Sequence, residues 1–105
     1  MEFKSGNIFI RPIESDAGSH TGGHTHNFDH TTIVFTGSVR VRATLVDGTE
    51  VEETFAAPGY FLVKKDVTHD IEALEDDTVY WCVYSHRDAQ GEVTQEANGW
   101  TAAYL

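Results

Sequence analysis

Alternation of apolar and polar positions is the clearest pattern in the chain, and it is strongest between residues 38 and 46. The apolar positions are Val39, Val41, Ala43 and Leu45, and the polar positions between them are Arg40, Arg42 and Thr44. A period of two is typical of a β-strand with one buried face. Asp47-Gly48 follows at once, and both residue types tolerate positive φ. The sequence therefore predicts a type I′ hairpin into a returning strand over residues 49–55.

Short runs rich in β-forming residues predict further strands along the chain. They cover residues 7–13, 30–35, 60–63, 69–74 and 78–86. A loop rich in Gly, Ser and Thr is expected at residues 15–23, and turns at Pro58-Gly59 and at the acidic segment 75–77. The pattern leaves open whether the tail at 91–105 is a helical turn or an extended flap. Many short strands separated by turn residues indicate an all-β sandwich or barrel.

The length and composition favour one small intracellular domain. The 105 residues fit a single domain, 1–105, with two prolines and no linker-like tract. Cys82 is the single cysteine, so no intramolecular disulfide is possible. The N-terminus lacks the basic start and apolar run of a signal peptide, and no apolar stretch is long enough to span a bilayer. A cytoplasmic location is expected.

The charge balance narrows the classes of partner. Seven basic residues against 17 acidic ones give a net charge of −10. Such a surface repels phosphate backbones and anionic headgroups, so we expect neither nucleic-acid nor membrane binding. The expected partner is a small-molecule substrate, and an anionic one requires a local cation such as a metal ion.

Six histidines stand out less by number than by placement. His24 and His26 are two residues apart, so both rings point to one side of an extended chain, and His30 has the same parity. Gly22-Gly23 lets the backbone bend in front of them. Taken alone, the His24/His26 pair fits a polar surface loop as well as a metal site. Neutral imidazole is a common ligand of first-row divalent metals, and the two further histidines, His30 and His69, favour the metal interpretation.

Two segments resemble the sequence motifs of the cupins. His24-Thr-His26-Asn-Phe-Asp-His30, then six residues, then Gly37, is similar to the first motif, in which a glutamate occupies the place of His30. A Pro-Gly turn, a strand and then His69 resemble the second motif. There the chain departs from the family: residues 65–68 replace the usual Pro-x-Gly turn, and an alanine follows where an asparagine is common. The motifs and the region between them cover roughly half of the chain.

The resemblance implies a single-domain cupin, a double-stranded β-helix or jelly-roll barrel, with a metal site in its mouth. It implies that His24, His26, His30 and His69 share one divalent transition metal ion. Fe(II) or Mn(II) is the favoured ion, with Ni or Zn as alternatives; an all-protein tetrahedral Zn site is typical of a structural role. Four neutral ligands leave the ion its full charge, which strengthens binding of an anionic, oxygen-chelating ligand.

The predicted strand at 78–86 carries the candidate catalytic residues. Tyr80, Cys82, Tyr84 and His86 share one of its faces. If that face lines the barrel, Tyr80, Tyr84 and His86 are candidates for hydrogen bonds to a bound ligand or for proton transfer. The alternative is that the tyrosines fill the barrel, His86 lies on the surface at the strand end, and Cys82 is an inert core residue.

Three functions follow from this interpretation. The first is a metal-dependent dioxygenase acting on a small oxygenated substrate chelated by the metal. The second is a non-catalytic module that binds a metal or small molecule for storage or sensing. The third is an epimerase or isomerase, which needs an acid–base pair such as His86 with a tyrosine. A homodimer formed through an N-terminal strand is also expected, because edge strands need cover and the family often pairs in this way.

Overall fold

The structure is a computed structural model that describes residues 2–24, 28–85, 87–90 and 92, with backbone alone at positions 3, 5, 23 and 24. Within these residues it is all-β. The strands assigned there are β1 (Phe3–Ser5), β2 (Ile8–Ser15), β3 (His20–His24), β4 (His30–Thr36), β5 (Ser38–Thr44), β6 (Glu50–Ala56), β7 (Gly59–Val63), β8 (Thr68–Ala73) and β9 (Thr78–Ser85). No helix that could cross a membrane occurs in this part of the chain.

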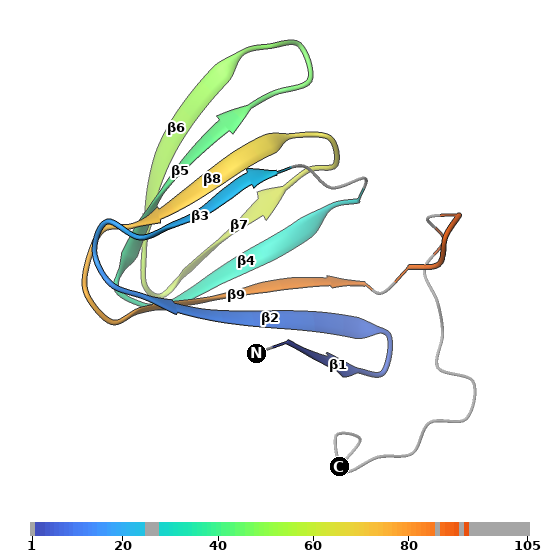
Figure 1. The fold of residues 1–105 in the computed structure, drawn as a ribbon, viewed down its shortest axis with the longest axis horizontal. Helices are drawn as coiled ribbons and strands as arrows, with labels where there is room; N and C mark the ends of the chain where they lie inside the picture. The colour runs from blue at the N-terminus through green and yellow to red at the C-terminus, as the bar shows by residue number, and fades with distance from the viewer. Residues whose placement is uncertain (1, 25–27, 86, 91, 93–105) are drawn as a thin grey trace.

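The strands form two antiparallel sheets (Figure 1). One has the order β1-β2-β9-β4-β7, and the other has the order β3-β8-β5-β6. Among the described strands, the chain changes sheet at every connection except the β1–β2 and β5–β6 hairpins. Segments distant in sequence are therefore brought face to face, which is the arrangement of a jelly roll.

The core lies between the two sheets and receives side chains from both. Its buried members are Val34, Val39, Val41, Phe61, Val63, Val67, Ile71 and Tyr80. On β5 the predicted alternation is confirmed, because Val39 and Val41 are buried while Arg40 and Arg42 lie on the outer face.

Two strands were not predicted. The loop expected at residues 15–23 is wrong in its second half, because β3 begins at His20 and pairs with β8. The sequence His-Thr-Gly-Gly-His has no apolar alternation, so its extended conformation comes from the partner strand and not from local propensity. The short strand β1, which pairs with β2, was also not predicted from the sequence pattern.

The hairpin between β5 and β6 is not of type I′. Gly48 has a φ of 91°, but Asp47 does not have positive φ. The Gly48 N–H donates to the Leu45 carbonyl at 2.9 Å, and the Leu45 N–H donates to the Thr49 carbonyl at 2.8 Å. The loop is therefore three residues long, with the glycine in the left-handed position. The Thr49 N–H donates to the Asp47 carboxylate at 2.9 Å, which stabilises this turn and lowers the pKa of Asp47.

Candidate metal centre

His30 and His69 meet inside the barrel although they belong to different sheets. His30 opens β4, and His69 is the second residue of β8. Both are buried, with exposed fractions of 4% and 3%, and their ring centroids are 5.1 Å apart. Metal–imidazole bonds of about 2.1 Å place two ring centroids about 5 Å apart when both rings bind one ion. The separation of this pair therefore fits a shared metal ion.

The protonation of the His69 ring also fits a metal ligand. Its Nδ1 lies 3.2 Å from the Val67 carbonyl oxygen. A carbonyl only accepts hydrogen bonds, so Nδ1 carries the proton and the lone pair of the neutral ring lies on Nε2. Metal-binding histidines are typically oriented by such a bond from the second ring nitrogen.

A backbone contact ties together the segments that precede the two histidines. The Lys65 N–H donates to the Asp29 carboxylate at 2.8 Å. Asp29 comes just before β4, and Lys65 lies in the tight turn before β8, where Asp66 has a φ of 64°. Asp29 is therefore a positioning residue that the sequence analysis missed. An aspartate before a strand is a common turn residue, so no local pattern marks its partner.

A cavity of about 60 Å³ contains both histidines. Its described lining residues are Arg11, Thr21, His30, His69, Ile71, Cys82 and Tyr84. Tyr84 is held there by Phe9 and Phe28, with ring centroids at 4.9 and 4.6 Å. A cavity of this volume holds several water molecules, so it suits a ligand of a few non-hydrogen atoms.

Comparison with solved structures identifies the architecture. Over 78% of its length this chain is similar to an oxalate decarboxylase of Lactobacillus farciminis in a formate complex, at 20% identity and a TM-score of 0.71. Over 87% it is similar to the oxalate decarboxylase of Bacillus subtilis studied for its Mn(II) centers, at 20% identity and a TM-score of 0.72. KdgF from Halomonas sp. matches over 82% at 20% identity and a TM-score of 0.65. The chain has the cupin fold.

These similarities show the fold alone. This chain spans 24% of the length of each of the two oxalate decarboxylases and 76% of the length of KdgF. No protein-family model matches the sequence, and no curated protein matches it either. The fold predicted from the motifs is thus confirmed by three-dimensional similarity, at a sequence identity too low to transfer an activity.

The other predicted ligands of the cupin site are only partly described. His24 ends β3, and its backbone pairs with His69 across a β-bulge that begins at Gly22. The side chain of His24 and all of His26 and His86 lie outside the described residues. Among the side chains that the structure does describe, no group of three or more His, Cys, Asp or Glu forms a metal site. The four-histidine set stays a prediction.

Gly22 lies in close contact with the backbone of β8. A Cβ at this position would lie 2.4 Å from the Asp70 Cα and 2.6 Å from the His69 carbonyl oxygen. We predicted Gly22-Gly23 as a bend before the histidine pair. The structure adds a stronger reason for the first glycine, which is that no side chain fits between the two strands.

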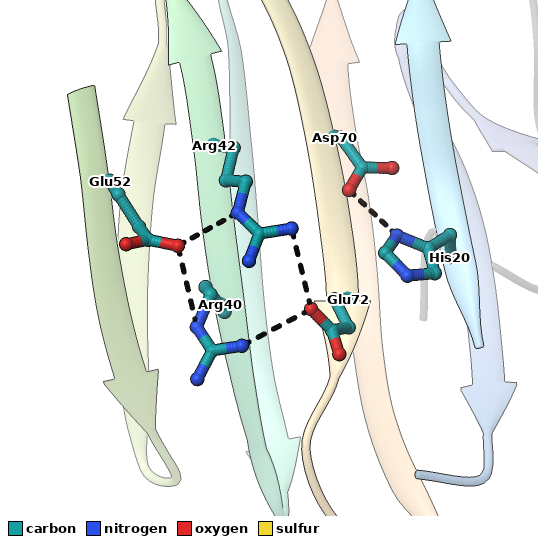
Figure 2. Close-up of polar contacts among 6 residues, drawn as sticks. All are labelled: His20, Arg40, Arg42, Glu52, Asp70 and Glu72. Carbon is teal, nitrogen blue, oxygen red and sulfur yellow. Dashed lines mark hydrogen bonds and ion pairs between the residues drawn. The ribbon is translucent and has the colours of Figure 1, made fainter. Parts of the chain in front are cut away.

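The alternation of β8 separates the interior of the barrel from a charged outer face (Figure 2). His69 and Ile71 point inward, while Asp70 and Glu72 lie on the outside. The Nδ1 atom of His20 is 2.8 Å from the outward Asp70 carboxylate. It therefore belongs to the outer face and not to the candidate centre.

The two candidate tyrosines occupy different environments. Tyr84 lines the cavity that holds His30 and His69, whereas Tyr80 is not among the described residues that line it. Tyr80 is 1% exposed and belongs to the hydrophobic core. Burial raises the pKa of both phenols, so both are protonated at neutral pH.

The thiol of Cys82 is a cavity wall group and not an activated nucleophile. Its sulfur lies 3.6 Å from the Thr32 hydroxyl oxygen, and burial raises its pKa above the ordinary value. Since the thiolate is the reactive form, the thiol is inert at neutral pH.

Alkylation of Cys82 by iodoacetamide at pH 8 is expected to be at least about tenfold slower than alkylation of the unfolded chain. The folded chain keeps the thiol proton at a pH where the unfolded chain has lost it. The stabilisation that comes from the raised pKa of Cys82 is therefore complete below the unfolded-state pKa and is lost as pH rises through the folded-state pKa. Mass spectrometry of timed samples, with and without denaturant, measures both rates. Equal rates would show that the thiol is not buried.

Proposed function

We propose that this cupin binds one divalent transition metal ion through His24, His26, His30 and His69 and holds a small oxygenated substrate against it. The observation that carries the proposal is the buried His30–His69 pair, with centroids 5.1 Å apart and the lone pair of His69 on Nε2. The backbone of His24 pairs with that of His69, which supports the inclusion of the histidines of the first motif in the same site.

Fe(II) or Mn(II) is the ion that we propose, with Ni or Zn as alternatives, since imidazole nitrogen suits all four. The Mn(II) centers of the similar Bacillus subtilis oxalate decarboxylase support a divalent ion. When bound, the ion supplies Lewis acidity and a template for an oxygenated ligand. The chain supplies the orientation: the phenol of Tyr84, protonated at neutral pH, can donate a hydrogen bond to a ligand oxygen in the cavity.

Oxidation of the chelated substrate by dioxygen is the reaction class that we propose. A non-catalytic binding module is the second candidate. It is favoured because the described side chains that line the cavity offer no evident general base. Cys82 and Tyr84 are protonated at neutral pH, and the proposal uses His30 and His69 as metal ligands. An epimerase would need His86 with a tyrosine, and the burial of Tyr80 in the core leaves Tyr84 as its better partner.

Elemental analysis of the protein purified without a histidine tag tests the metal site. About one transition metal ion per chain is expected, and a metal-free protein that takes up no added Mn²⁺ or Fe²⁺ would overturn the proposal. Oxygen uptake by the iron-loaded protein with diketones, flavonols and thiols then separates the oxygenase from the binding module. Turnover that is unchanged in His86→Ala would exclude His86 as an acid or base.

A further inference from the structure

One strong cation lines the cavity of the candidate metal centre. Arg11 lies on β2 between the inward-facing Phe9 and Ile13, and its register partner on β9 is Cys82. It borders the same cavity as His30 and His69. Among the described lining residues, Arg11 is the one with a permanent charge.

The charge of Arg11 acts on the cavity. It lowers the pKa of Cys82 and of Tyr84, against the larger effect of burial. In a chain with a net charge of −10, a guanidinium at this position gives the cavity a local sign opposite to that of the whole molecule. A local field of this kind favours an anionic ligand.

The present partner of Arg11 leaves room for such a ligand. The Arg11 Nε lies 3.5 Å from a carboxylate oxygen of Glu2, and the two side chains are 47% and 54% exposed. An exposed pair at this distance is weak and easily exchanged. A guanidinium has five N–H donors, so contact with Glu2 does not occupy it fully.

We propose that Arg11 binds the carboxylate of a small substrate whose remaining oxygens face the metal. The substrate class is therefore a short carboxylic acid with a neighbouring hydroxyl or carbonyl oxygen, of a size compatible with a cavity of about 60 Å³. This assignment rests on the proposed metal site, and Arg11 is its specificity-determining residue. Glu2 is the group that the substrate carboxylate replaces.

The test uses the Mn²⁺-loaded full-length chain with two probes of equal size, glycolate and its uncharged amide, glycolamide. Binding is measured by the displacement of Mn²⁺-bound water in proton relaxation. Arg11→Gln is expected to weaken glycolate binding between about tenfold and a hundredfold, with glycolamide and Mn²⁺ affinities unchanged. Lys64→Gln is the matched control, because it removes one positive charge from an exposed side chain outside this cavity.

The outcomes separate this inference from the metal site itself. If the wild type binds no Mn²⁺, the proposed function fails. If Mn²⁺ binds and Arg11→Gln leaves glycolate affinity unchanged, or weakens glycolate and glycolamide equally, the assignment of Arg11 is wrong. Glu2→Gln gives a second measurement, since loss of the competing carboxylate is expected to strengthen glycolate binding, and weakened binding would contradict the proposal.

Discussion

His69→Ala is expected to lower the affinity of this protein for Mn²⁺ by at least about a hundredfold. Replacement of a group that merely orients a metal ligand already costs about 10- to 100-fold, and His69 is proposed to bind the ion itself. Its ring is 3% exposed, faces His30, and is oriented by the Val67 carbonyl. Titration calorimetry with Mn²⁺, with a competing chelator where binding is tight, measures the loss.

His20→Ala is the control for this prediction. The chemical change is the same, but His20 lies on the outer face and pairs with Asp70 at 2.8 Å. Its metal affinity is expected to equal that of the wild type. Thermal unfolding of both metal-free variants shows whether they fold. A folded His69→Ala variant with wild-type affinity would remove the candidate centre.

Gly22→Ala is expected to destabilise the protein by about 2–3 kcal/mol, the upper part of the range typical of an overpacked site. The added methyl group would meet the backbone of Asp70 and His69 at 2.4 and 2.6 Å, and backbone atoms cannot rotate away. β3 must therefore move away from β8. Because His24 lies two residues further along β3 and pairs with His69, a loss of metal affinity is expected to accompany the loss of stability.

Gly48→Ala provides the comparison for Gly22→Ala. Its φ of 91° makes alanine unfavourable, but a Cβ there meets nothing within 4 Å. We expect a cost of about 1–2 kcal/mol from the left-handed backbone conformation and unchanged metal affinity. Denaturant unfolding measures both stabilities. If Gly22→Ala costs no more than Gly48→Ala and binds metal normally, the close contact between β3 and β8 has no functional importance.

The local pattern of the chain predicts the strands whose two faces differ. On β5 and β8, side chains alternate between core and solvent, so a period of two is visible before any partner is known. The resemblance to the cupin motifs predicted the fold and the four candidate histidine ligands. His30 and His69, drawn from segments 39 residues apart, do lie together in the interior.

Local pattern fails where a partner strand decides the conformation. β3 has two glycines and no apolar alternation, and it is a strand because β8 supplies its hydrogen bonds. The hairpin after β5 was predicted as type I′ from residue types alone. The bond from the Thr49 N–H to Asp47 is a feature of the folded turn, and it stabilises the three-residue loop.

The sequence by itself predicted an all-β chain with the cupin fold and with histidines as candidate ligands, because strand periodicity and motif spacing are local properties. The tertiary structure decided the position of Arg11 at the cavity, the hydrogen bond from the Lys65 N–H to Asp29, and the different environments of Tyr80 and Tyr84. These features depend on which strands lie side by side and which faces meet. Such contacts join residues far apart in the chain, so no short stretch of sequence encodes them.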